Sequence, residues 1–216
     1  AGAWSYTQTV PKSLQARVRA KLVETIERLA ASGETVADAP PEHLVFDMME
    51  VATGHRLGGE YLGVFREEAN FGEGDARDVD WRDGRPAEAG NRLVVVIGTG
   101  FSGVLAAIKL KRAGIPFVVV EKNDGVGGTW LENSYPGIGV DTPCHFYSYA
   151  FEPNSDWSSY FTEGAEILGY IRHCAHKYGI MDAIRFGEEV VSAVFDEPAA
   201  RWRVRTRRRD GAEATI

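Results

Sequence analysis

A glycine-rich turn with the spacing Gly-x-Gly-x-x-Gly follows a short apolar segment at residues 93–97 and precedes an amphipathic one. In such a turn the first glycine permits a tight bend, the second lets the backbone approach a pyrophosphate, and the third lets helix and strand pack closely. A helix that starts here directs free N–H groups and the positive end of its dipole at phosphates. A glycine-rich turn without function is the alternative, because the motif alone is weak evidence. The predicted cofactor-binding residues in this turn are Gly98, Gly100, Phe101, Ser102 and Gly103.

An acidic residue ends the next apolar strand, residues 117–120. Glu121 lies about 20 residues beyond the glycines, where a carboxylate can accept a hydrogen bond from a ribose 2′-OH. An acid at this position favours FAD or NAD over NADP, because it would repel the 2′-phosphate of NADP. Strand, glycine turn, helix, strand and acid in this order predict a Rossmann-like α/β fold.

A second glycine-rich turn, residues 124–130, follows closely and ends in a bulky aromatic residue. Two such turns in succession would let the backbone run along an extended cofactor such as FAD. Gly128, Thr129 and Trp130 are therefore further candidates for cofactor binding. For Trp130 the alternative is a place in the hydrophobic core.

Four motifs in order, together with Glu121, resemble the FAD-binding half of type I Baeyer–Villiger monooxygenases. These motifs are GTGFSG (98–103), GVGGTW (125–130), SYPG (134–137) and VDTPCHFYSYAF (140–151). The resemblance covers roughly residues 92 to 214. Members of this family use FAD, NADPH and O2 to convert ketones into esters or lactones, so the resemblance implies a ketone substrate and both cofactors.

The resemblance also implies roles for single residues. Asp141 matches the acid beside the flavin that pairs with a catalytic arginine, although a turn or N-cap role before Thr142 is the alternative. A buried Asp beside a guanidinium favours the charged form of both groups. Thr129 and Trp130 match positions that touch the isoalloxazine, and Tyr147 matches a tyrosine that contacts the flavin. Val190 matches a residue whose backbone binds the adenine.

The first part of the chain is predicted to be helical, with helices at 11–32, from 40 to 51 and near 61–68, followed by a Gly- and Asp-rich linker at 72–90. We therefore divide the chain into a helical extension with its linker, 1–90, and the first part of an FAD-binding domain, 91–216. Residues 48–65 resemble the N-terminal extension of the 4-hydroxyacetophenone monooxygenase subgroup. The apolar stripe of these helices must be buried against the FAD domain or a partner subunit, which makes a homodimer possible.

The last part of the chain predicts one helix and a meander. Thr162 is expected to cap a helix that buries one face and ends at Gly179. The buried face comprises Ile167, Tyr170, Ile171 and Cys174. Short strands are expected at 184–186, 190–195 and 202–206, with a hairpin turn at 210–211. In the last strand arginines would point outward, while Trp202, Val204 and Thr206 would point inward.

Composition excludes several classes of function. A net charge of −7 gives no support to nucleic acid or an anionic membrane as a partner, and no apolar run approaches the ~20 residues of a membrane span. Two cysteines cannot make a disulfide framework, so a cytoplasmic location is expected. His173 and His176 do not provide the about four donors of a zinc site. Cys144 and His145 are adjacent and would point to opposite faces of a strand.

The chain is expected to be incomplete. It opens without an initiator Met and stops where a strand begins. In the family that it resembles, a second GxGxxG for NADPH, a catalytic arginine and an FxGxxxHTxxWP fingerprint follow, and this chain contains none of them. The remainder of the same polypeptide is thus a predicted partner. Two alternatives stay open: a flavin monooxygenase that oxidises nitrogen or sulfur, and a non-catalytic flavin-binding module.

Overall fold

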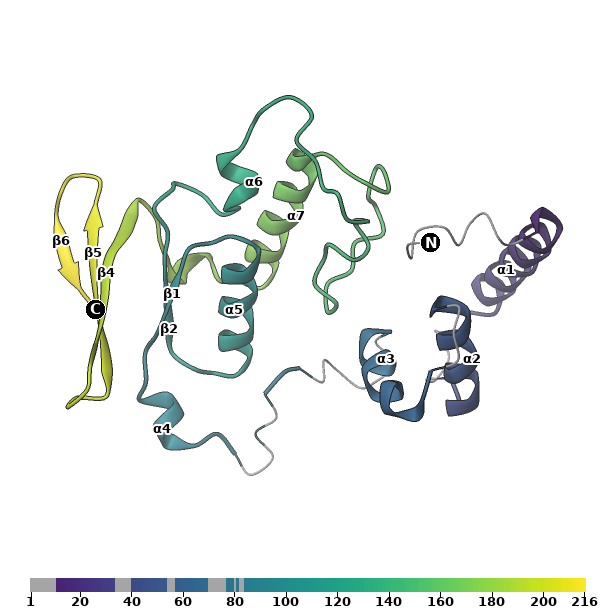
Figure 1. Cartoon of the computed structure of the whole chain (residues 1–216), viewed down its shortest axis with the longest axis horizontal. Helices are drawn as coiled ribbons and strands as arrows, with labels where there is room; N and C mark the ends of the chain where they lie inside the picture. Colours follow the sequence, from purple (N-terminus) through teal and green to yellow (C-terminus); the bar gives the residue numbers. More distant parts are fainter. Residues whose placement is uncertain (1–10, 34–39, 54–56, 70–76, 80, 82–83) are drawn as a thin grey trace. The chain divides into compact units, whose positions relative to one another are not determined.

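The chain divides into two compact units, residues 1–75 and 76–216. The structure, a computed structural model, describes residues 11–33, 40–53, 57–69, 77–79, 81 and 84–216 (Figure 1). The glycine-rich start of the predicted linker, residues 72–75, lies outside these ranges, as does Gly54 of the extension motif.

The first unit is helical, as predicted. It contains α1 (Lys12–Ser32), α2 (Glu42–Thr53), a 3-10 turn η2 (Gly59–Tyr61) and α3 (Leu62–Glu68). Helix α1 follows Pro11 and ends at Gly33, whose φ of 66° is the left-handed conformation that suits a glycine. Val45 and Met49 of α2 are fully buried, whereas none of the residues of α1 is buried. The predicted apolar stripe of α1 is therefore exposed.

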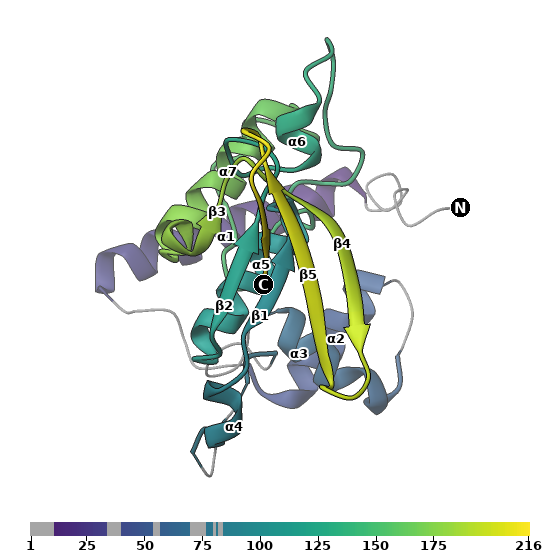
Figure 2. The same cartoon turned by 90° about the vertical axis from the view of Figure 1, so that its left-hand side faces the viewer.

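The second unit is built on a parallel sheet. Strands β1 (Val94–Ile97), β2 (Phe117–Val120) and β3 (Ile184–Arg185) lie in the order β1-β2-β3, and both pairs are parallel. Helix α5 (Phe101–Arg112) connects β1 to β2 and packs along both strands (Figures 1 and 2). This strand–helix–strand arrangement confirms the predicted Rossmann-like α/β fold.

Helix α7 (Gly164–Lys177) completes the core of this unit. It packs against α5 and against the short helix α6 (Thr129–Glu132). The predicted buried face is confirmed, and Gly179 follows the helix with a φ of 62°. Thr162 is not the N-cap: that position is Glu163, without a side-chain capping bond. The Thr162 hydroxyl instead donates a hydrogen bond to the Glu166 carboxylate. It therefore does not cap the backbone N–H groups of the helix.

Residues 77–90, predicted as part of the linker, are fastened to the α/β unit. Asp78 accepts hydrogen bonds from Lys109 (2.6 Å) and Arg112 (3.0 Å) of α5. The Trp81 indole N–H donates to the carbonyl oxygen of Ala113 at 2.9 Å. The short helix α4 (Ala87–Gly90) then precedes β1.

An antiparallel meander ends the chain (yellow in Figures 1 and 2). After the 3-10 turn η3 (Met181–Ala183) and β3, strands β4 (Glu188–Asp196), β5 (Arg201–Arg208) and β6 (Glu213–Thr215) pair in sequence. Val204 and Thr206 are buried as predicted, but Trp202 is 62% exposed, so its inward position was wrong. Trp202 lies near the start of β5 and packs on its cross-strand partner Phe195, with ring centroids 5.3 Å apart.

Candidate functional site

The first glycine turn lies at the carboxyl end of β1, the edge of a parallel sheet where ligands bind in α/β proteins. Gly98 has a φ of 86°, and its N–H donates to the carbonyl oxygen of Val120 at 2.8 Å. A Cβ on Gly103 would overlap the carbonyl oxygen of Gly98 and touch the Val96 side chain. The first glycine therefore makes the bend and the third lets α5 pack onto β1, as the motif predicts.

The N-terminus of α5 is open. Gly100 precedes the helix and supplies no side-chain cap. A Cβ built on Gly98 meets no atom within 4 Å, and one on Gly100 meets Cα of Gly128 at 3.7 Å. The first turn of a helix has N–H groups without partners inside the helix, and they carry the positive end of the dipole. This turn can therefore accept a phosphate group.

The second glycine turn packs against the first. The N–H of Gly127 donates to the carbonyl oxygen of Thr99 at 3.0 Å. A Cβ on Gly128 would lie 2.6 Å from Cα of Gly100, and the φ of Gly128 is 53°. The two backbones can approach this closely because Gly128 has no side chain. The two predicted turns therefore form one continuous backbone surface.

Glu121 lies between these turns and is almost fully buried, with 3% of its surface exposed. Its Oε2 accepts hydrogen bonds from the N–H (2.7 Å) and the hydroxyl (2.6 Å) of Thr99. Its Oε1 accepts one from the N–H of Asn123 at 2.8 Å. The structure thus places Glu121 beside the glycine turn, as predicted, and adds Thr99, which the motif treats as a variable position.

Three predicted residues form an aromatic cluster beside the turns. Phe101 and Tyr147 have ring centroids 5.0 Å apart, and Trp130 meets Tyr147 edge-on at 5.8 Å. The Trp130 indole N–H also donates to the Tyr147 hydroxyl at 3.3 Å. Each ring comes from a different segment: Phe101 starts α5, Trp130 lies in α6 and Tyr147 lies in the following loop. Ser102, the second residue of α5, and Thr129, the first residue of α6, are exposed.

A hydrogen-bond chain that the sequence did not indicate connects this cluster to α7. The hydroxyl of Tyr149 donates to the carbonyl oxygen of Phe101 at 2.6 Å. The N–H of Tyr149 donates to the Tyr170 hydroxyl at 2.8 Å, and that hydroxyl donates to the carbonyl oxygen of Glu152, also at 2.8 Å. Burial raises the pKa of both tyrosines, so both keep their protons and can donate.

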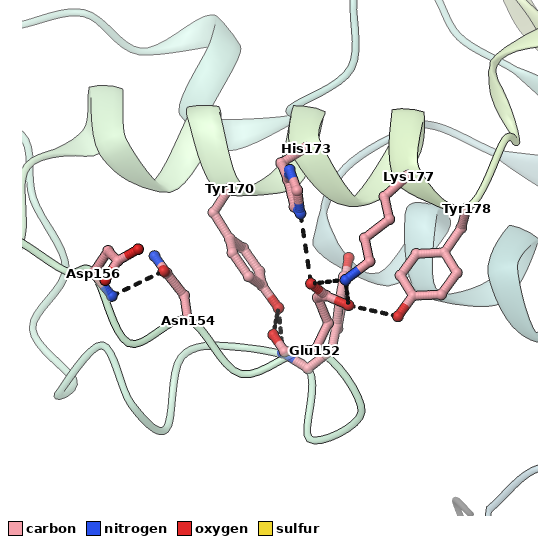
Figure 3. Close-up of polar contacts among 8 residues, drawn as sticks. Glu152, Asn154, Asp156, Tyr170, His173, Lys177 and Tyr178 are labelled. Atoms are coloured by element: carbon pink, nitrogen blue, oxygen red, sulfur yellow. Dashed lines mark hydrogen bonds and ion pairs between the residues drawn. The ribbon is translucent and has the colours of Figure 1, made fainter. Parts of the chain in front are cut away.

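Glu152 fastens the loop to the end of α7 (Figure 3). Its carboxylate accepts hydrogen bonds from Lys177 (2.7 and 2.8 Å) and Tyr178 (2.6 Å), and His173 lies 3.5 Å away. Burial raises the pKa of Glu152, but the hydrogen bonds from Lys177 and Tyr178 and the charge of Lys177 together lower it below its ordinary value. Burial, then the Glu152 carboxylate, raise the pKa of Tyr178 to about 12. This contact holds the loop that carries Tyr147 and Tyr149.

Two predicted site residues lie outside the aromatic cluster. Asp141 is exposed in the loop after the buried Val140, and the Thr142 hydroxyl lies 3.4 Å from its Oδ1. Val190 lies at the start of β4, next to a register shift in the β4–β5 pairing. This end of β4 lies beside Glu121, because the N–H of Glu188 donates to the Glu121 carbonyl oxygen at 3.0 Å.

Two kinds of feature are absent from the described residues. No group of three or more His, Cys, Asp or Glu side chains in this part of the chain could hold a metal ion. None of the described helices is long and apolar enough to cross a membrane.

Comparisons with known proteins agree with this geometry. The family model of the NAD(P)-binding Rossmann-like domain matches residues 96–163. A Baeyer–Villiger monooxygenase of Streptomyces coelicolor is 44% identical over 114 residues, which cover 52% of this chain and 22% of that protein. An FAD-binding monooxygenase of Aspergillus terreus is 45% identical over 115 residues, covering 51% of this chain and 20% of that protein.

A solved structure shows the same fold. An oxidized steroid monooxygenase bound to NADP superposes with a TM-score of 0.52 at 37% identity, covering 57% of this chain and 24% of that one. The resemblance to Baeyer–Villiger monooxygenases is thus confirmed, whereas the subgroup with the N-terminal extension stays a prediction. The chain spans about a fifth to a quarter of the length of these relatives.

Proposed function

We propose that this chain is the FAD-binding part of a Baeyer–Villiger monooxygenase, which uses NADPH and O2 to insert one oxygen atom next to a ketone carbonyl. The observation that carries the proposal is the contact between the two glycine turns at the open N-terminus of α5, with the aromatic cluster beside them. The named relatives support it, since they include a Baeyer–Villiger monooxygenase and an FAD-binding monooxygenase.

The residues fit FAD in three places. The backbone of residues 98–103 and the first turn of α5 would bind the pyrophosphate, because no side chain covers the glycines there. Glu121 would accept a hydrogen bond from the adenosine ribose, and the backbone at Val190 would contact the adenine. Thr129, Trp130 and Tyr147 would lie at the isoalloxazine. When bound, FAD supplies the redox chemistry of the reaction.

The rest of the reaction depends on residues outside this chain. We assign the NADPH domain and the catalytic arginine to the remainder of the polypeptide, and we assign Asp141 the role of positioning that arginine. An exposed Asp141 is compatible with this role, because a charged partner from elsewhere can reach it. We also propose that the protein resides in the cytoplasm, since Cys144 and Cys174 are both free and buried. A separate proposal concerns the extension, which we expect to pack on the FAD domain or to form a homodimer.

The experiment uses the full-length protein purified with its bound flavin. We expect it to be yellow, to release FAD on denaturation, and to consume NADPH faster when a ketone is added. Mass spectrometry under ¹⁸O₂ should detect one labelled oxygen in the ester. A protein that oxidises thioethers or amines but no ketone would instead be a heteroatom monooxygenase. A protein that stays colourless with added FAD would contradict the proposal altogether.

The role of Asp141 has its own test in the same protein. Asp141→Ala should bind FAD normally but lose at least about a hundredfold in ester formation, because the arginine is no longer held in place. NADPH would then be consumed with release of hydrogen peroxide, which a peroxidase-coupled assay measures. Asp141→Glu, which keeps the carboxylate, is the matched control. If NADPH consumption in Asp141→Ala remains coupled to ester formation, Asp141 serves only the turn.

A further inference from the structure

Thr99, the residue between the first two glycines, connects three parts of the candidate site. It is 1% exposed. Its N–H and its hydroxyl both donate to Oε2 of Glu121, at 2.7 and 2.6 Å. Its carbonyl oxygen accepts the N–H of Gly127 at 3.0 Å. One residue therefore links the first glycine turn, the acid at the end of β2 and the second glycine turn.

The hydrogen bonds of Glu121 occupy most of the acceptor positions that a ligand could use. A carboxylate has about four acceptor positions, two on each oxygen. Thr99 fills both positions on Oε2, and the N–H of Asn123 fills one on Oε1 at 2.8 Å. One acceptor position on Oε1 remains. The Thr99 hydroxyl is the donor to Oε2, which fixes the orientation of its O–H group.

We propose that Thr99 is a positioning residue for ribose recognition: its hydroxyl holds the Glu121 carboxylate so that Oε1 accepts a hydrogen bond from one hydroxyl of the adenosine ribose. This inference rests on the proposed function, because FAD is the ligand that brings the ribose. The Thr99 side chain acts through Glu121, because its hydroxyl already donates to Oε2. Its role is to orient Glu121 before the ligand arrives, which reduces the ordering required on binding.

Two substitutions separate this role from simple packing. Thr99→Val keeps the shape of the side chain but removes the hydroxyl, so Oε2 loses one of its two donors. Thr99→Ser keeps the hydroxyl and removes only a methyl group. A positioning role therefore predicts a defect in the valine variant that the serine variant does not share, whereas a packing role predicts the reverse.

The experiment measures dissociation constants of ADP and of 2′,3′-dideoxy-ADP by calorimetry, using the full-length protein freed of flavin. FAD is measured in parallel by fluorescence quenching. Thr99→Val should bind ADP and FAD about tenfold more weakly than the unmodified protein, and Thr99→Ser within about twofold of it. All three proteins should bind dideoxy-ADP equally weakly, because that ligand has no ribose hydroxyl for Glu121 to recognise.

A second measurement uses the unmodified protein alone and does not depend on how the variants fold. If one acceptor position remains on Oε1, only one of 2′-deoxy-ADP and 3′-deoxy-ADP should lose affinity, and the other should bind like ADP. Equal losses for both analogues would overturn the single-acceptor geometry. An equal effect of Thr99→Val on ADP and dideoxy-ADP, or a defect that serine fails to restore, would overturn the positioning role. Failure of the unmodified protein to bind either FAD or ADP would refute the proposed function itself.

Discussion

Helices α5 and α1 have similar apolar spacing but opposite environments. Helix α5 has 12 residues and buries Val104, Ala107 and Ile108 against the sheet and α7. Helix α1 has 21 residues and buries none; its apolar positions Leu14 and Val18 are 43% and 59% exposed. Periodicity therefore predicts that a helix forms, but it does not say what the helix packs against.

The difference lies in how each helix begins. Helix α5 starts in a turn whose third glycine allows its first turn to lie directly on the backbone at Gly98. The chain then returns through β2, which buries Val119 and Val120 beside the helix. Helix α1 starts after Pro11, and the described part of its unit contains helices and no strand. How closely α5 packs on the sheet therefore depends on a glycine as well as on apolar side chains.

The largest effect on stability is expected from a side chain at Gly103, because it would abolish the close contact between α5 and the backbone at Gly98. A Cβ in Gly103→Ala would overlap the Gly98 carbonyl oxygen, so the helix or the turn must move. We expect a loss of about 3 kcal/mol or more in the free energy of unfolding, measured by urea denaturation. Gly169→Ala is the control, because Gly169 lies in α7 with open space around it. That change should stabilise the chain by up to about 1 kcal/mol.

The next effect concerns binding rather than folding. A Cβ in Gly100→Ala would meet only Cα of Gly128, at an ordinary distance of 3.7 Å. The fold should therefore tolerate alanine, with a change in unfolding free energy below about 1 kcal/mol. FAD binding should be lost, because the methyl group occupies the space of the pyrophosphate. Normal FAD affinity in a flavin quenching titration would show that Gly100 serves only the turn.

A smaller effect on stability is expected at the loop that contains Glu152, which polar contacts hold to the end of α7. Glu152→Gln should lower the unfolding free energy by about 1–2 kcal/mol at neutral pH, because Lys177 and Tyr178 lose a charged acceptor. The folded pKa of Glu152 lies below its ordinary value of 4.5, so its contribution is fully present above that pH. It is lost as the pH falls through the lowered pKa.

The difference between Glu152→Gln and the unmodified chain should therefore be constant from pH 7.5 to 8.5 and shrink below about pH 4.5. Thermal unfolding across this range measures it. Glu163→Gln is the matched control, since Glu163 makes no side-chain capping bond at the start of α7. A difference that grows as the pH falls would contradict the assignment of the ionised carboxylate to this contact.

The smallest effect is expected in α1. Leu22 is 56% exposed within the single chain, so Leu22→Ala should change its unfolding free energy by less than about 0.5 kcal/mol unless the proposed packing of the extension buries this face. A loss above about 1.5 kcal/mol would show that this face is buried in solution. Sedimentation at two protein concentrations would then tell whether a second copy covers it.

The parts predicted correctly from the sequence depend on short-range spacing. The bends at the glycines and the buried face of α7 follow from residues a few positions apart, and the place of Glu121 follows from the strand that ends just before it. The chain of hydrogen bonds through Tyr149, Tyr170 and Glu152 could not be predicted, because its partners are far apart along the chain and tyrosine is a common core residue. Thr99 was overlooked because the motif specifies glycines and leaves the residues between them undefined.

Two predictions were wrong because a side chain found a nearer partner. Thr162 has a residue type that caps helices, but its hydroxyl bonds the Glu166 side chain. Trp202 follows the strand alternation, but it packs on Phe195 at the exposed end of the meander. In both cases a contact with a side chain nearby in the sequence prevailed over the position that the general rule predicts.

The contact between Gly100 and Gly128 has a consequence for how this sequence can evolve. The two residues are far apart in the chain, yet a Cβ on Gly128 would lie 2.6 Å from Cα of Gly100. Every residue has a Cα, so no substitution at position 100 would make room for a side chain at position 128, and the φ of 53° at Gly128 also favours glycine. Selection for this contact therefore acts on the codon of residue 128, and a recombinant of two homologous genes keeps the contact only if the parent that supplies residue 128 encodes glycine there.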